Sequence, residues 1–164
     1  MSNESLNYDM VAVSKYFSKT TKRGIVLAKE LGEGLVTSKA LLTGMLKAAN
    51  EVSPLGIPAE VINRIESYTL KELKANKYGY EGYGLWNKVD GRKFILTPAA
   101  KKALVDSRKH SLKQEVSFVA AHHVVLALLQ QETVRYYLNG VCKVNAQKLE
   151  RSLRGGCTLQ DLED

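Results

Sequence analysis

The sequence has few proline, cysteine and aromatic residues. Among its 164 residues are 3 Pro, 2 Cys and only 7% aromatic residues. With 45% hydrophobic and 25% charged residues, the composition is that of a soluble globular chain and excludes a disordered one. Low aromatic content disfavours an all-β fold, and frequent Leu, Ala and Lys favour helix because these side chains lose little rotamer freedom there. We therefore expect an all-α protein.

The sequence also lacks targeting and cross-linking signals. No apolar run reaches the roughly 18 residues that a membrane span needs, and the first residues form neither a basic stretch nor a signal-length apolar stretch. Cys142 and Cys157 lie 15 residues apart, which matches no CxxC metal or redox spacing. These absences predict a cytoplasmic protein in a reduced compartment, without a membrane partner.

Charge is the one composition feature that points to a partner. The net charge is +7 with a pI near 9.4, and residues 76–164 carry 14 Lys and Arg against 9 Asp and Glu. No basic run exceeds two residues, whereas nucleic-acid sites usually cluster basic residues and add a motif. A solvated surface is therefore the preferred interpretation. The alternative is a nucleic-acid patch on one helix, formed by Lys101, Lys102, Arg108, Lys109 and Lys113.

Apolar periodicity and capping residues predict most of the secondary structure. Ser18 is a candidate N-cap for the first helix, and Thr97 followed by Pro98 is a stronger one for the fourth. The segment 120–131 is apolar on almost every side, so it should be the central buried helix of the second half. The predicted helices are 18–33, 37–50, 59–75 (one helix or two short ones), 97–112, 120–131, 134–138 and 145–153, the last two flanking a turn at Gly140-Val141.

Residues 76–95 differ from the rest and read as a linker. Three glycines alternate with aromatic residues, and Asp90-Gly91 suits the positive φ angles of a type I′ turn. A short β-hairpin of 85–89 with 92–96 is compatible with this pattern. The aromatic residues either form a platform for a bound peptide or fill the groove between two repeats; they are Tyr78, Tyr80, Tyr83 and Trp86.

The chain contains an internal repeat. Residues 17–26 align without gaps on 96–105, and residues 37–46 align on 120–129. Both copies place a hydrophobic residue and a hydroxyl cap ahead of paired basic residues. Two copies about 80 residues apart predict a pseudo-twofold helical bundle. The expected organisation is one compact domain, divided into a flexible lead (1–13), repeat 1 (14–75), linker (76–95), repeat 2 (96–153) and tail (154–164).

The repeated motifs resemble a known family. Residues 96–104 read LTPAAKKAL and fit F-T-x-x-A-x-x-x-L, and residues 123–129 read HVVLALL and fit the end of G-T-E-H-L-L-L-G-L-L. Repeat 1 is more divergent and keeps Phe17-Ser18, Leu41-Leu42 and 44–46. At these positions the sequence resembles the Clp N-terminal domain, the double repeat that precedes the ATPase modules of ClpA, ClpB and ClpC chaperones. The resemblance implies an all-α double-repeat fold that binds proteins.

Departures from the family limit what the resemblance implies. No GxxxxGK[ST] phosphate loop is present, so the chain lacks that route to ATP. In some ClpC-like members, the hydroxyl of the first motif and the Glu of the second form phosphoarginine pockets. The matching pairs here are Ser18 with Lys39, and Thr97 with His122, which are the candidate partner-binding positions. Neither pair has a carboxylate for a guanidinium, so we do not expect phosphoarginine recognition.

No catalytic or metal motif is visible. Adjacent His122 and His123 point about 100° apart on a helix and cannot form an i, i+4 metal pair, so no metal, cofactor or enzymatic activity is expected. His123, at the family's usual His, should form structural hydrogen bonds near the core, and His122 should be exposed. Cys142 and Tyr136-Tyr137 are interpreted as core residues.

These observations lead to one main functional hypothesis. We expect a non-catalytic protein-binding module that acts through the face between the repeats, as an adaptor, stabiliser or substrate-docking element for a Clp ATPase or protease. Expected partners are Clp ATPase or protease subunits, their adaptors or unfolded clients. The alternatives are a basic nucleic-acid-associated helical module, or the N-terminal fragment of a full Clp ATPase.

Overall fold

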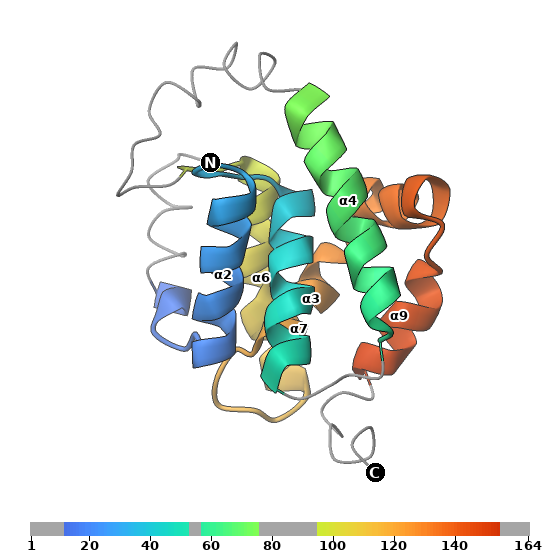
Figure 1. The fold of residues 1–164 in the computed structure, drawn as a ribbon. Helices are drawn as coiled ribbons and strands as arrows, with labels where there is room; N and C mark the ends of the chain where they lie inside the picture. The colour runs from blue at the N-terminus through green and yellow to red at the C-terminus, as the bar shows by residue number, and fades with distance from the viewer. Residues whose placement is uncertain (1–11, 53–56, 76–94, 155–164) are drawn as a thin grey trace.

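The fold is all-α, as predicted (Figure 1). The computed structural model describes residues 12–52, 57–75 and 95–154. Helices α2, α3 and α4 lie side by side across the front of Figure 1, with α6 and α7 behind them. The elements are α2 (Lys19–Leu31), β1 (Leu35–Val36), α3 (Ser38–Val52), α4 (Ala59–Ala75), β2 (Ile95–Leu96), α6 (Pro98–Lys113), α7 (Ala121–Leu128), α8 (Glu132–Tyr136), the π-helical η2 (Tyr137–Cys142) and α9 (Ala146–Arg154).

Helices α2 and α6 begin with the same type of cap, which confirms the two predicted N-caps. The Ser18 hydroxyl accepts a hydrogen bond from the Thr21 N–H at 3.3 Å, and the Thr97 hydroxyl accepts one from the Ala100 N–H at 3.3 Å. Each bond satisfies one of the donors that a helix start leaves unpaired. Helix α2 ends at Leu31, with Gly32 as its C-cap.

The segments that precede α3 and α6 pair with each other. Strand β1 runs parallel to β2, with Val36 opposite Leu96. The N–H of Thr97, the cap of α6, then donates to the Val36 carbonyl at 3.0 Å. The start of a helix in the second half is thus fixed to the residue that leads into a helix of the first half.

The segments that precede α2 and α7 are joined in the same way. Phe17 and Val119 form an isolated parallel bridge. The N–H of Ser18, the cap of α2, donates to the Val119 carbonyl at 2.9 Å, and the Val119 N–H donates to the Tyr16 carbonyl at 2.7 Å. The internal repeat itself stays a prediction. A pseudo-twofold bundle requires two equivalent contacts of this kind. We call these two contacts, Thr97 with Val36 and Ser18 with Val119, the crossed junctions.

The predicted hairpin falls mostly outside the described residues, as do the four linker aromatics at 78, 80, 83 and 86. Of the second hairpin strand, the structure describes Ile95–Leu96, which pair in parallel with Leu35–Val36. The hairpin stays a prediction for the part of the chain between 76 and 94.

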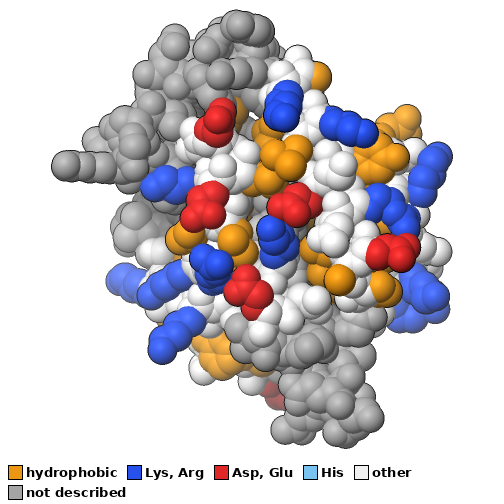
Figure 2. Space-filling view, in the orientation of Figure 1, with side chains coloured by type: hydrophobic (Ala, Val, Ile, Leu, Met, Phe, Trp, Pro, Cys, Tyr) orange, Lys and Arg blue, Asp and Glu red, His pale blue; other side chains and the backbone are white. Residues whose placement is uncertain are grey.

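Helix α4 is one continuous helix held against α3 by two ion pairs. The Lys39 ammonium lies 2.7 Å from a Glu72 carboxylate oxygen, and the Lys47 ammonium lies 2.8 Å from Glu66. These side chains are only about one quarter to one third exposed, so water screens them less than fully exposed pairs. In Figure 2, which views the face of α2, α3 and α4, charged side chains are interspersed with hydrophobic ones.

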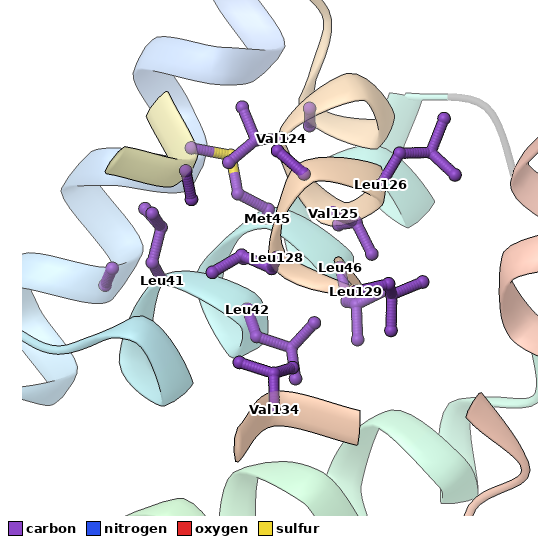
Figure 3. Packing of buried hydrophobic residues seen from close by; sticks show 14 of the residues in the cluster. Leu41, Leu42, Met45, Leu46, Val124, Val125, Leu126, Leu128, Leu129 and Val134 are labelled. Atoms are coloured by element: carbon purple, nitrogen blue, oxygen red, sulfur yellow. The ribbon is translucent and has the colours of Figure 1, made fainter. Parts of the chain in front are cut away.

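The core lies where α3 meets α7 (Figure 3). All eight residues of α7 are buried, which confirms the predicted central buried helix. Burying one Leu or Val side chain contributes roughly 1.5 to 3 kcal/mol, so this interface supplies much of the folding free energy. The side chains that meet there are Leu41, Leu42, Met45 and Leu46 from α3, Val124, Val125 and Leu128 from α7, and Leu129, the C-cap of α7.

Helices α2 and α3 approach closely at two glycines. A Cβ placed on Gly44 would lie 2.3 Å from the Gly24 carbonyl oxygen and 2.8 Å from the Ala28 nitrogen. Both contacts are with backbone atoms of α2, which cannot rotate away as a side chain could. The absence of a side chain at Gly44 therefore sets the α2–α3 distance.

The region after α8 corrects one prediction. Gly140-Val141 does not form a turn between two helices; it lies inside the π-helical segment η2. In a π-helix, hydrogen bonds join residues five apart, so such residues lie on one face. Tyr137 and Cys142 are buried, as predicted, but Tyr136 is 74% exposed, so its assignment to the core is wrong.

We expect Gly44→Ala to lower the free energy of unfolding by about 1 to 2 kcal/mol. Overpacking against backbone typically costs about 1 to 3 kcal/mol, and the helix-propensity gain of up to about 1 kcal/mol offsets only part of it. Urea denaturation followed by circular dichroism measures the change. Gly140→Ala is the matched control, since its Cβ would meet only the Tyr136 ring at 3.7 Å. Equal stabilities of the two variants would contradict the close α2–α3 contact.

Candidate functional site

The four candidate binding residues inferred from the family resemblance already have internal partners. The Ser18 and Thr97 hydroxyls cap α2 and α6. The Lys39 ammonium bonds both carboxylate oxygens of Glu72 at 2.7 Å. His122 was expected to be exposed, but only 6% of its surface is accessible. Each of these four side chains therefore contributes to the structure of the fold itself.

The structure also places the four residues beside different helices from those that the expected pairs imply. Ser18 was paired with Lys39, and Thr97 with His122. The crossed junctions place Ser18 at the start of α7, the helix of His122, and Thr97 at the start of α3, the helix of Lys39. The expected pairs were taken from motifs within one repeat. In the structure, the backbone at the start of each of these helices is bonded to the other half of the chain.

The two adjacent histidines bind one glutamine. The Nδ1 of His123 accepts a hydrogen bond from the Ala120 N–H at 2.8 Å, so the remaining ring proton is on Nε2, which lies 2.8 Å from the Gln114 Oε1. The Nε2 of His122 lies 3.0 Å from the same oxygen. Gln114 in turn donates to the Leu153 carbonyl at 3.3 Å. This cluster joins α6, α7 and α9 and confirms the structural role predicted for His123.

Burial keeps both histidines neutral. Loss of hydration lowers the pKa of His122 from 6.5 to about 4, and the pKa of His123 to about 3, where neighbouring His122 adds to the effect. A general acid or base works best with a pKa near the operating pH. Neither ring has such a pKa.

A cleft lies between the two halves of the chain, beside Lys39. Its volume is about 450 Å³, within the range of ordinary ligand sites. One wall comes from α3 and α4, and the other from α8 and η2. The residues that line this inter-repeat cleft are Lys39, Glu72, Glu132, Thr133, Tyr136, Tyr137 and Val141.

A chain of hydroxyl groups lies beneath the inter-repeat cleft. The Thr43 hydroxyl donates to the Lys39 carbonyl at 3.0 Å, so it must accept from Thr69, at 3.2 Å. Thr69 then accepts from the Tyr137 hydroxyl at 2.8 Å. Burial raises the pKa of Tyr137, so this hydroxyl keeps the proton that it donates. The Lys39 ammonium lies 4.6 Å from the Tyr137 ring centre, which adds a cation–π contact.

The outer rim of the inter-repeat cleft is apolar and exposed. Tyr136, the last residue of α8, is 74% exposed, and Val141, in the π-helical η2, is 40% exposed. Exposed aromatic side chains beside a cleft are typical anchors for protein partners. The sequence interpretation grouped Tyr136 with its neighbour Tyr137 as core residues, but only Tyr137 is buried.

The basic residues of α6 do not act as one free patch. Asp106 binds the Lys102 ammonium at 2.9 Å and the Lys109 ammonium at 3.8 Å. The Arg108 guanidinium donates to the Ser117 carbonyl at 3.1 Å and lies over the Tyr16 ring. These contacts weaken the interpretation of this helix as a nucleic-acid surface.

We expect Tyr137→Phe to lower the free energy of unfolding by about 1 to 2 kcal/mol, because it removes the donor to the buried Thr69 oxygen. Tyr136→Phe is the matched control and should change stability by less than about 0.5 kcal/mol, since its ring is exposed. Chemical denaturation of the three proteins compares them. If Tyr137→Phe matches the wild type, the hydroxyl chain does not stabilise the fold.

Acid should destabilise the protein already at pH values above those at which carboxylates usually titrate. All three histidines in the sequence, at 110, 122 and 123, have a lowered pKa in the fold. The unfolded chain therefore binds more protons below pH 6.5, so stability is fully present above pH 6.5 and is lost as pH falls toward 4.

We expect the free energy of unfolding to fall on the order of 2 to 4 kcal/mol between pH 7 and pH 5. His122→Gln should reduce this pH dependence. In NMR spectra, the ring signals of His122 and His123 should stay constant over the same range. Ring signals that titrate near pH 6.5 would contradict the neutral, buried pair.

Two kinds of site are not found in the part of the chain that the structure describes. Within residues 12–52, 57–75 and 95–154, no helix is long and apolar enough to cross a membrane. The same residues contain no group of three His, Cys, Asp or Glu side chains that could hold a metal ion. Compared with known proteins, the chain matches no protein-family model and has no significant match among curated proteins.

Proposed function

We propose that this chain is a non-catalytic protein-binding module that docks on a Clp ATPase or protease, as an adaptor, a stabiliser or a substrate-docking element. The resemblance of residues 96–104 and 123–129 to the Clp N-terminal domain supports the choice of partner. The paired junctions at Val36 and Val119 support it as well, since they are the contacts that a double-repeat bundle needs. The same role applies if the chain is one part of a longer Clp ATPase.

The inter-repeat cleft is the observation that carries this proposal. Both halves contribute a wall, so the cleft exists only in the assembled bundle. Tyr136 and Val141 present apolar surface at its rim, and Lys39 with Glu72 supplies polar groups inside it. An apolar rim around a few polar groups is suited to a protein segment, because aromatic anchors contribute most of the binding free energy.

The chemistry of the described side chains favours binding over catalysis. The buried Cys142 has a raised pKa and so remains a thiol, a poor nucleophile. The Lys39 ammonium bonds both carboxylate oxygens of Glu72, so it is engaged in the fold. His122 and His123 are neutral and bonded to Gln114. None of these groups has the state that nucleophilic or acid–base catalysis requires.

The cleft variant Tyr136→Ala/Val141→Ser should lose the Clp partner. The tagged full chain is captured from a lysate of its own source, with and without nuclease, and Clp ATPase and protease subunits are quantified. Removing an aromatic anchor typically costs 2 kcal/mol or more, so recovery should fall by about tenfold or more. Wild-type recovery should be unaffected by nuclease.

The control variant Leu112→Ala/Phe118→Ser removes comparable exposed apolar surface at residues that do not line the cleft. It should retain the wild-type level of Clp subunits. Equal loss in both variants would reject the cleft as the docking site. Recovery of nucleic acid alone would reject the proposed function and favour the nucleic-acid alternative.

A further inference from the structure

A second, larger groove lies on the opposite side of α3 and α4 from the Tyr137 wall. Its volume is about 620 Å³, and it shares no lining residue with the inter-repeat cleft. Helices α2 and α4 form its walls and α3 forms its floor, on the face seen in Figure 2. Its apolar lining includes Leu27, Leu31, Leu70 and Leu73, and we call it the front groove.

The close approach of α2 to α3 shapes the front groove. Gly44 lies on its floor, and the contact between Gly44 and Gly24 draws α2 tightly onto α3. Helix α4 is instead joined to α3 by long side chains, such as the Lys47–Glu66 pair that lines the groove. Because α2 lies close to α3 while α4 is held at the length of two side chains, an open channel remains between α2 and α4.

The apolar walls follow helical spacing. Leu27 and Leu31 are four residues apart on α2, and Leu70 and Leu73 are three apart on α4. At about 1.5 Å per residue, each pair covers about one helical turn. An amphipathic helix places its own apolar residues at i, i+3, i+4 and i+7. Such a stripe fits between two walls of leucines.

The α2 end of the front groove is negative on a strongly basic protein. Glu30 and Glu33 lie exposed there, and the C-terminal end of α2 adds the negative pole of the helix dipole. On the floor, Lys47 is neutralised by Glu66 at 2.8 Å, and Lys74 lies on the α4 wall. With a net charge of +7 for the whole chain, this local acidity favours a ligand with a basic residue at that end.

We propose that the front groove binds an amphipathic helix of a partner protein, with a Leu, Ile or Met stripe between α2 and α4 and a Lys or Arg beside Glu30 and Glu33. The apolar walls supply affinity, because they remove the stripe from water. The two carboxylates set the direction of the bound helix, because only one end of the groove attracts a cation. This site does not depend on the Clp partner proposed for the inter-repeat cleft.

Synthetic peptides test the proposal on the full chain. The probe is a fluorescein-labelled helical peptide of about 14 residues, or roughly four turns, with Leu at i, i+4 and i+7 and two Lys at one end. A scrambled peptide of the same composition and a peptide with Glu in place of Lys serve as controls. Fluorescence anisotropy should show binding of the probe that is at least about tenfold tighter than that of either control.

Two variants locate the binding site. Leu70 is 37% exposed, so Leu70→Glu should fold normally and weaken binding of the probe by about tenfold or more. Glu30→Lys should weaken binding of the Lys peptide and strengthen binding of the Glu peptide. Leu112→Glu changes an exposed leucine that does not line the groove and should leave both affinities unchanged.

Three outcomes would overturn the proposal. Equal binding of the probe and the scrambled peptide would show that the groove has no helical register. An unchanged affinity in Leu70→Glu would place the peptide elsewhere. If no peptide binds, two measurements on Leu70→Glu identify another occupant: a shift in the emission of the single tryptophan, Trp86, would indicate the chain's own linker, and a smaller sedimentation coefficient than wild type would indicate a second copy.

Discussion

The crossed junctions are the constraint on which the rest of the structure depends. The Thr97 N–H binds the Val36 carbonyl and the Ser18 N–H binds the Val119 carbonyl, so four helices start from two shared points. Because each point joins the two halves, neither half can orient its helices alone. The leucines and valines of the α3–α7 core (Figure 3) come from helices whose starts are fixed in this way. Residues of α3 line both the inter-repeat cleft and the front groove.

The sequence was sufficient for what depends on local chemistry. Hydroxyl caps at Ser18 and Thr97 and the apolar α7 predicted the helices and the buried centre, because capping and periodicity act within one turn or two. His122 could not be placed, since its partner Gln114 belongs to another helix and only folding shows that the ring is enclosed. Tyr136 ends α8 with its ring exposed, whereas the adjacent Tyr137 is buried at the start of η2, and residue type alone does not distinguish the two. The contact of Ser18 with Val119 could not be predicted from motifs within one half, because it joins the two halves.

Helix α4 links the two proposed binding surfaces. Its Glu72 lines the inter-repeat cleft and its Leu70 and Leu73 line the front groove. Between them, the buried Thr69 joins Tyr137, which lines the cleft, to Thr43, which lines the groove. Directional hydrogen bonds in a buried chain fix the rotation of the helix more strictly than apolar contacts would. The same interactions that stabilise α4 therefore keep both surfaces in shape.

The positive charge of the chain has a structural explanation that a count of residues misses. Arg64 donates to the Cys142 and Lys143 carbonyls that end η2, Arg108 donates to the Ser117 carbonyl, and Arg135 donates to the Leu129 carbonyl at the end of α7. Helix ends and irregular segments leave carbonyl groups unpaired, and a guanidinium satisfies several of them at once because its donors are fixed in a fork. Part of the basic excess thus stabilises turns and helix ends. These three guanidinium groups are engaged by backbone carbonyls, so they are less available to a nucleic acid than their number suggests.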